Sequence, residues 1–414
     1  MKSSLRVIVT GLIAQHRLLG GVAWDYINIV LGLKRLGHDV YYMEDSGEWP
    51  YNFDGGAGGN KWSVDDPKPN IKSLANVMSQ FGLGHKWAYR FPTKQEWFGL
   101  SADIREEVIR SADLLINVSG TLEHPSHYRQ VQKLVYLDTD PVFTQIAVAN
   151  GNSELRARID AHDVHFTVGE CLGPAVPDTG HKWHPTKHPI VLGEWRSSLP
   201  YQNTFTTVMN WTSYKPLAYH GRTYGQKDVE FVKFMNLPQQ AHSTALEVAL
   251  PKLHHVRWQS HYEKVAPQVQ ALMENHRQWT PHEMLKHLGW RVIDATEVCC
   301  DFSGYRRYIQ SSKGEWSIAK NGYVNGQSGW FSGRSACYLA AGRPIVVQDT
   351  GFSQVLPVGQ GVLSFNTLEE AAAGLQEVEH NYRQHSKAAT AIAETYFDSD
   401  KVLSRIVTMA FSAG

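Results

Sequence analysis

Short runs of apolar residues alternate along this chain with longer stretches in which apolar residues recur at helical spacing. Residues 5–10 form the first run, and after a polar loop residues 22–36 repeat apolar side chains every three or four positions. Gly37 then follows, and residues 40–43 form a second run. A short apolar run predicts a buried strand, and helical spacing predicts an amphipathic helix. This segment therefore predicts two parallel strands joined by a right-handed helical crossover.

The same alternation continues to the end of the chain. In the first half we expect a helix at 102–111 and strands at 114–118, 134–137 and 165–168. In the second half we expect strands at 205–209, 245–250, 290–293, 345–347 and 361–365. The helices expected there cover residues 228–235, 281–288, 305–311, 369–397 and 401–411. A glycine-rich cluster at 54–60 does not join a strand to a helix and predicts a flexible loop.

A stretch rich in proline, glycine and histidine, residues 173–200, separates the two series of elements. Such a stretch predicts a domain boundary, and a length of 414 residues allows each domain its own core. The expected fold class is therefore α/β, with two doubly wound, Rossmann-like domains. We expect the first domain to comprise residues 1–195 and the second residues 196–385.

The composition argues against several classes of protein. Lys+Arg and Asp+Glu both number 40, so the chain has no global basic field of the kind that attracts nucleic acid or an anionic membrane. No apolar run reaches about eighteen residues, and the chain starts without an apolar signal segment, so we expect no membrane span and a cytoplasmic location. The four cysteines lack CxxC spacing and are interpreted as free thiols.

Residues 329–351 carry the most specific chemical signal. Ser332 can cap a helix that begins near Gly333, with Arg334 in its first turn, and Gly342 stops that helix. The free backbone N–H groups at such a helix start, together with an arginine, form an anion site. The start of this helix therefore predicts a cradle for a diphosphate.

The strand at 345–347 follows that helix directly. Asp349, Thr350 and Gly351 come next, at the carboxyl end of the strand, where open α/β sheets bind ligands. A carboxylate and a hydroxyl at this place suit the hydroxyl groups of a sugar. Together with the diphosphate cradle, they predict a site for a nucleotide sugar.

Residues 331–347, within this two-domain pattern, resemble the donor-site helix and strand of the GT-B glycosyltransferases, in particular group 1 glycosyltransferases and spore-maturation-type relatives. Gly20 and Gly21, before residues 22–26, resemble the acceptor-side opening of the same class. The resemblance implies an enzyme that moves a sugar from a nucleoside-diphosphate sugar to a small-molecule or glycan acceptor, with no metal or other cofactor. It also implies that the domains face an interdomain cleft, and that helices in 386–414 cross back to the first domain.

The resemblance further implies which residues bind the donor. Arg334 takes the place that faces the diphosphate, and Arg222 and Lys227 lie where relatives carry further cations. Glu315 and Trp316 belong to a loop–strand unit that lines the base pocket in this class, although Trp316 equally suits a core position. The remaining candidates around the donor helix are Ser328, Gly329, Ser332, Gly333 and Ser335.

Catalysis in an inverting member needs a base that takes the proton of the acceptor. His16 lies in the loop after the first strand, where inverting GT-B enzymes often carry their base, and Asp25 and Asp140 either orient it or take its role. Retaining members usually hold the ribose with a glutamate at the position of Cys337, and a thiol cannot replace a bidentate carboxylate. Cys337 and His16 therefore favour an inverting reaction, but the sequence leaves both inversion versus retention and the identity of the base open.

Two alternatives come from other features. Asp138 and Asp140 form a DxD pattern, which in metal-dependent GT-A transferases binds a divalent ion and the nucleotide sugar. The other alternative is a non-catalytic GT-B protein that binds a nucleotide sugar, which Cys337 favours. The sequence does not determine the donor base, the sugar, the acceptor or the oligomeric state.

Overall fold

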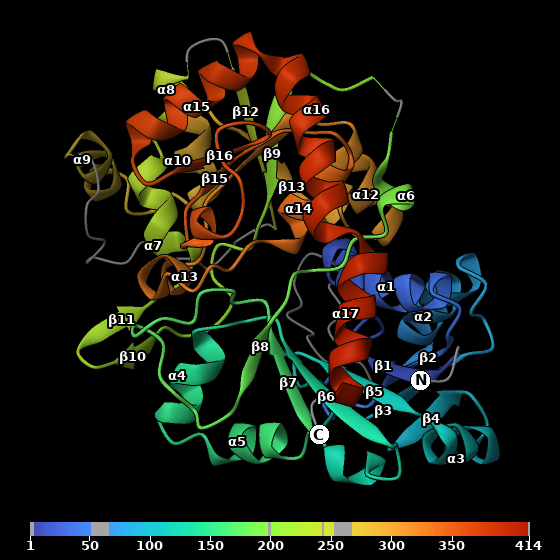
Figure 1. Cartoon of the computed structure of the whole chain (residues 1–414). Coiled ribbons are helices and arrows are strands. Elements are labelled where there is room, and N and C mark those ends of the chain that lie inside the picture. The colour runs from blue at the N-terminus through green and yellow to red at the C-terminus, as the bar shows by residue number, and fades with distance from the viewer. Residues whose placement is uncertain (1–3, 51–65, 198–199, 242–243, 252–266, 413–414) are drawn as a thin grey trace.

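Two sheets of mainly parallel strands, each flanked by helices, lie in the two halves of the molecule (Figure 1). The computed structural model describes residues 4–50, 66–197, 200–241, 244–251 and 267–412. The glycine-rich cluster at 54–60 lies outside the described residues. The α/β class with doubly wound parallel sheets is confirmed.

The first sheet has eight strands in the order β4-β3-β2-β1-β5-β6-β7-β8. The strands are β1 (Arg6–Thr10), β2 (Asp39–Glu44), β3 (Trp87–Phe91), β4 (Glu96–Gly99), β5 (Leu114–Val118), β6 (Lys133–Asp138), β7 (Val164–Thr167) and β8 (Trp183–Pro185). Only the β3–β4 pair is antiparallel. The strands predicted in this half are confirmed, whereas β3, β4 and β8 were missed. Two of these lie at the sheet edges and carry exposed residues, so their apolar pattern is weak.

The described residues of the first half form six α-helices. They are α1 (Gly20–Arg35), α2 (Lys68–Gln80), α3 (Ala102–Ser111), α4 (Phe143–Ala149), α5 (Ser153–Asp160) and α6 (Leu192–Trp195). The core of this half forms around the central strands: Val7, Ile8 and Val9 of β1 are all fully buried. Both faces of β1 are therefore covered, as expected for the centre of a parallel sheet.

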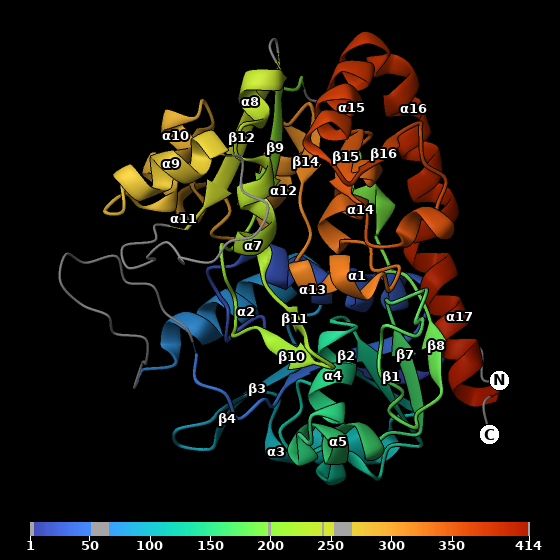
Figure 2. The ribbon, with the colours of Figure 1, turned by 90° about the vertical axis from the view of Figure 1, so that its left-hand side faces the viewer.

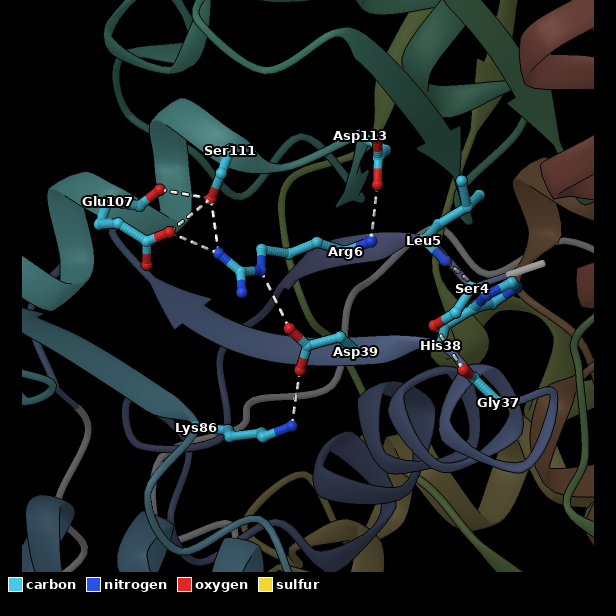
Figure 3. Close-up of polar contacts among 10 residues, drawn as sticks. All are labelled: Ser4, Leu5, Arg6, Gly37, His38, Asp39, Lys86, Glu107, Ser111 and Asp113. Atoms are coloured by element: carbon cyan, nitrogen blue, oxygen red, sulfur yellow. Dashed lines mark hydrogen bonds and ion pairs between the residues drawn. The ribbon is translucent and has the colours of Figure 1, made fainter. Parts of the chain in front are cut away.

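A network of charged side chains fixes the amino ends of the central strands (Figure 3). Arg6 Nε donates to Asp39 Oδ2 at 2.9 Å, and Lys86 Nζ donates to the other carboxylate oxygen at 2.6 Å. Arg6 Nη1 also donates to Glu107 on α3 at 2.8 Å. These contacts connect β1, β2 and α3 at the amino ends of the strands. The carboxyl ends of the strands, on the opposite side of the sheet, are left for a ligand.

The second sheet has six parallel strands in the order β13-β12-β9-β14-β15-β16. They are β9 (Thr204–Val208), β12 (Ala245–Leu250), β13 (Arg291–Asp294), β14 (Gly314–Ser317), β15 (Ile345–Gln348) and β16 (Val362–Phe365). Between β9 and β12 the chain forms an antiparallel hairpin, β10 (Leu217–Tyr219) and β11 (Arg222–Tyr224). The first described strand of this sheet starts after the predicted boundary at 195. The exact division into domains stays a prediction.

The helices of the second half precede or follow these strands. They are α7 (Lys227–Phe231), α8 (Leu237–Gln240), α9 (Pro267–Asn275), α10 (Pro281–His287), α11 (Ala295–Val298), α12 (Phe302–Gln310), α13 (Asn321–Gly326) and α14 (Gly333–Ala340).

Three longer helices end the chain: α15 (Leu368–His380), α16 (Tyr382–Ile392) and α17 (Ser399–Ser412). Thr367 accepts a hydrogen bond from the N–H of Glu370, whose carboxylate returns one, so α15 begins with a capping box. The continuous helix expected over 369–397 is interrupted at Asn381, where the backbone leaves helical geometry. α16 packs on α14, whereas α17 packs on α1 and runs down the first half (Figures 1 and 2).

Candidate donor and acceptor site

Helix α14 begins where the sequence places it, but without the expected side-chain cap. Ser332 has the extended backbone of an N-cap residue, φ −69° and ψ 131°, yet its hydroxyl makes no capping hydrogen bond. The first N–H groups of α14 are therefore left for another acceptor. The prediction that the Ser332 side chain caps this helix is therefore wrong.

Arg334, in the first turn of α14, is held from two sides. Its Nε donates to Glu315 Oε1 at 2.6 Å, and its Nη1 donates to the carbonyl oxygen of Val208 at 2.6 Å. Burial opposes the charge of Arg334, but Glu315, together with Tyr305 and Tyr338, outweighs burial and raises the pKa of Arg334. Glu315, on β14, is fully buried, and its Oε2 has no hydrogen-bond partner among the described residues. The guanidinium is thus fixed in orientation before any ligand arrives.

Arg334 lines a cavity of about 360 Å³, which we call the central cavity. The first half of the chain contributes Gly20, Gly21, Asp25, Thr139 and His188 to its wall. The second half contributes Asn210, Lys227, Lys320, Ser332, Gly333 and Arg334. Both halves therefore build this one cavity, at the start of α14 and at the carboxyl ends of strands such as β9.

Close packing of α1 against the second half forms one wall of this cavity. The N–H of Gly20 donates to the carbonyl oxygen of Cys299 at 3.0 Å, and Trp24 Nε1 donates to that of Phe302 at 2.7 Å. A Cβ atom at Gly20 would lie 2.1 Å from the carbonyl oxygen of Asp301. Only glycine lets α1 start so close to the turn before α12, which gives a structural reason for one of the two glycines in the predicted opening.

Asp25 is the carboxylate of the first half that reaches the central cavity. Its side chain is exposed to solvent in this cavity, which is partly open. The protein atoms around the carboxyl group partly desolvate it and raise the pKa of Asp25 to about 7, although the charge of Arg334 opposes the rise. A carboxyl with a pKa near neutral can both take and release a proton at physiological pH.

His188 lies beside Asp25 at the start of α14. A Cβ atom at Gly333 would lie 3.3 Å from His188 Cγ and 3.5 Å from Asp25 Oδ1. Burial lowers the pKa of His188 to about 4, so its imidazole is neutral at neutral pH. Its Nε2 is buried without a partner among the described residues. His188 is not among the residues predicted for the site, and the missing side chain of Gly333 allows the start of α14 to approach it.

Asp140 and Lys320 connect the two halves next to the central cavity. Lys320 Nζ lies 3.2 Å from Asp140 Oδ1, and Tyr214 donates to Asp140 Oδ2 at 2.5 Å. Tyr323 also donates to Asp140. Lys320 follows β14 at its carboxyl end, a place at which the sequence rule for open sheets could have found it.

The structure thus brings five of the predicted residues to the central cavity: Asp25, Lys227, Ser332, Gly333 and Arg334. Glu315 acts on it through Arg334. Ser335 and Thr350 line a much smaller adjoining cavity of about 20 Å³, and the Thr350 hydroxyl donates to the carbonyl of Trp330.

Other predicted residues lie outside the central cavity. His16 is largely enclosed, and burial lowers its pKa to about 4. Arg222 is exposed on the β10–β11 hairpin. Asp349 accepts from the N–H of Gly351 at 3.0 Å and from Ser353 Oγ at 2.6 Å, which is a local turn.

Trp316, Ser328 and Gly329 pack against other parts of the protein and do not line the central cavity. Trp316 is 1% exposed and packs among Phe231, Phe234, Trp290 and Phe365, so the core alternative holds for it. Ser328 is fully buried. Gly329 has a φ of +73°, and a Cβ there would lie 2.9 Å from the backbone nitrogen of Cys171. Such a conformation and such crowding both require glycine.

Both carboxylates of the DxD pattern bind other side chains of the protein. Asp138 is buried and accepts hydrogen bonds from Thr144 at 2.7 Å, Gln145 at 3.0 Å and Thr167 at 3.0 Å. Its partner Asp140 is bound to Lys320 and two tyrosines. Within the described part of the chain, no group of three or more His, Cys, Asp or Glu residues could hold a metal ion. The GT-A alternative therefore finds no support in the placement of its two carboxylates.

No family model and no curated protein sequence matches the chain. Solved structures of similar fold do exist. An α-glucosyltransferase in complex with UDP-glucose and DNA containing an abasic site is 12% identical, with a TM-score of 0.56, over 98% of this chain and 99% of that one. HepE from Anabaena, in complex with UDP-glucose, is 11% identical, with a TM-score of 0.53, over the same shares of the two chains.

These similarities extend over nearly the whole length of both chains. No helix within the described ranges combines the length and the apolar character that crossing a bilayer requires. One of the similar structures contains DNA, so the expectation that this chain does not bind nucleic acid stays a prediction. The chain has the fold of the GT-B glycosyltransferases.

Proposed function

We propose that this protein is a glycosyltransferase that moves a sugar from a nucleoside-diphosphate sugar to a hydroxyl group of a small-molecule or glycan acceptor. One observation carries the proposal: the uncapped start of α14, with Arg334, opens into a cavity of about 360 Å³ that both halves of the chain line. The cavity volume is within the range of small-molecule sites. UDP-glucose, which the similar structures contain, is the first donor to test.

The diphosphate would bind between the start of α14 and three cationic side chains. Arg334 is fixed by Glu315, and Lys227 and Lys320 line the same cavity. As the bond from the sugar to the diphosphate breaks, negative charge grows on the leaving group. Fixed cations and helix N–H groups stabilise that charge, which is why we propose a reaction without a metal or other cofactor.

Asp25 is the best-placed base for an inverting reaction. An acceptor oxygen would attack the anomeric carbon, its proton would pass to an Asp25 carboxylate oxygen, and the electron pair of the broken C–O bond would leave with the diphosphate. Of the three bases considered from the sequence, only Asp25 lines the central cavity. Its pKa of about 7 suits proton transfer near neutral pH.

The test combines binding with turnover by the purified protein. Thermal unfolding is followed with UDP, GDP, TDP and their sugars, because a ligand that binds only the folded state raises the melting temperature. Release of the nucleoside diphosphate from a bound sugar nucleotide, with or without an added acceptor, then reports catalysis. Binding without release would favour the non-catalytic alternative. No binding of any of these nucleotides would refute the proposal.

A further inference from the structure

Two neighbouring side chains of the first half, Val142 and Phe143, insert into helix α13 of the second half. A Cβ atom at Gly322 would lie 2.3 Å from Phe143 Cζ, and one at Gly326 would lie 2.5 Å from Val142 Cγ2. Val142 is fully buried and Phe143 is 4% exposed. The two glycines of α13 therefore form a groove for these side chains, at the place where α4, α13 and the β10–β11 hairpin meet (Figures 1 and 2). We call this the α13 contact.

The backbone of Val142 is strained. Its φ of 76° and ψ of −58° form a γ-turn of the rare kind, and a positive φ is especially unfavourable for a β-branched residue. Such a conformation persists only where its surroundings enforce it. Here the N–H of Val142 donates to Gln145 Oε1 at 2.7 Å. The buried carboxylate of Asp138 accepts from Gln145 Nε2 at 3.0 Å and from the N–H of Asp140 at 3.1 Å. This network fixes the turn that presents Val142 and Phe143 to α13.

Polar and aromatic groups connect the two halves beside the same groove. Lys320 Nζ lies 3.2 Å from Asp140 Oδ1 and donates to the hydroxyl of Tyr214 at 2.8 Å. The ring centroids of Phe143, Tyr214 and Tyr323 lie 5.1, 4.5 and 5.3 Å from this ammonium. A carboxylate and three rings, contributed by both halves, therefore hold Lys320 in one place.

The second-half side of the α13 contact is also a wall of the central cavity. Lys320, Tyr323 and Trp330 line that cavity, whereas Val142 and Phe143 do not. Tyr323 stacks on Trp330, with their ring centroids 4.0 Å apart. The first half therefore positions this wall without reaching into the cavity.

We propose that the α13 contact is a latch, with Asp140, Val142 and Phe143 as positioning residues for donor binding. When Val142 and Phe143 occupy the groove, the two halves are held together and Lys320 stays at the wall where a sugar-nucleotide diphosphate binds. This inference rests on the proposed function and adds a means by which the first half controls the same site. A donor that binds only the latched arrangement stabilises it, so the stability of the latch and the affinity for the donor are coupled.

Gly326→Ala tests the latch from outside the central cavity. The φ of Gly326 lies outside the left-handed region, so its backbone accepts alanine, and the second half should tolerate the change. In the latched arrangement, however, the added methyl group would meet the stiff side chain of Val142. By calorimetry we expect UDP-glucose to bind the full-length variant about 5- to 150-fold more weakly, the usual range of such coupling. Without ligand, small-angle X-ray scattering should give a larger radius of gyration. Val142→Ala in the same chain makes room for the methyl group and should reverse both effects.

Two further variants complete the test. Gly193→Ala makes the same change in α6, where only Arg35 Nη1, at 3.8 Å, lies near the added Cβ atom, and it should behave as the unmodified chain does. Asp140→Asn adds no volume but removes the carboxylate that holds Lys320. It should weaken UDP-glucose binding and enlarge the radius of gyration, so it carries the test if Gly326→Ala does not fold.

The outcomes separate the two proposals. Unchanged affinity and radius in Gly326→Ala, effects that Val142→Ala does not reverse, or an Asp140→Asn variant that equals the unmodified chain would each overturn the latch and leave the proposed function standing. Failure of the unmodified chain to bind UDP-glucose or any other nucleotide of the thermal screen would remove the proposed function and its coupling to the latch. The scattering of the same variants would then still show whether the α13 contact holds the halves together.

Discussion

Replacing Arg334 by alanine should destabilise the fold as well as weaken donor binding. The arginine side chain is 13% exposed and its partner Glu315 is fully buried, with Oε2 already lacking a partner among the described residues. Arg334→Ala would leave a buried carboxylate without its counter-charge. Breaking a buried ion pair from one side costs about 3–5 kcal/mol of unfolding free energy.

The size of the effect in a melting experiment follows from the size of the second half. For units of 150–250 residues, about 1 kcal/mol corresponds to a shift of about 2–4 °C, so we expect a decrease of roughly 6–20 °C in the unfolding transition of that half. The assay is thermal unfolding without ligand for Arg334→Ala, Glu315→Gln and the double variant. Because glutamine removes the buried charge, the double variant should be more stable than Arg334→Ala alone.

Two results would contradict a structural role for the pair of Arg334 and Glu315. If Arg334→Ala melts within about 2 °C of the unmodified chain, or if the two substitutions add without interaction, the carboxylate of Glu315 is not held by Arg334. Nucleotide binding by the double variant then isolates the second effect. The loss of charge-assisted hydrogen bonds to a diphosphate should weaken binding by about 1.5–3 kcal/mol.

Asp25→Asn should abolish transfer and spare UDP-glucose binding, and transfer by the unmodified chain should rise as the pH increases through about 7, because only ionised Asp25 accepts a proton; full activity of the variant would place the base elsewhere. His16→Ala should leave transfer intact, because His16 does not line the central cavity; loss of kcat with an unchanged melting temperature would contradict this. Trp316→Ala should lower the unfolding free energy by about 3–5 kcal/mol in a denaturant titration, since the ring fills a buried aromatic cluster. Thr367→Ala should cost about 1 kcal/mol in the same titration through loss of the α15 cap, and no change there would refute a role for the capping box.

The sequence by itself determined most strands of the two sheets, about half of the helices, among them α1 and α15, and the α14–β15 unit. These elements are specified locally: apolar residues in β1 or β15 are buried on both faces, and Thr367 with Glu370 encodes the start of α15 within four residues. For the same reason, the positions of Arg334 and Lys227 at element starts followed from strand–helix order. Edge strands such as β8 were missed because a short, half-exposed strand needs little apolar pattern.

Only the tertiary structure decided which of the candidate side chains meet. Asp25, His188 and Gly333 come from three distant segments, and they approach because Gly20 allows α1 to pack against the turn before α12. Asp140 and Trp316 looked chemically suitable, yet the packing of the two halves gives one of them to an ion pair and the other to a core. Residue type states what a side chain can do, whereas burial and neighbours decide whether it faces a ligand.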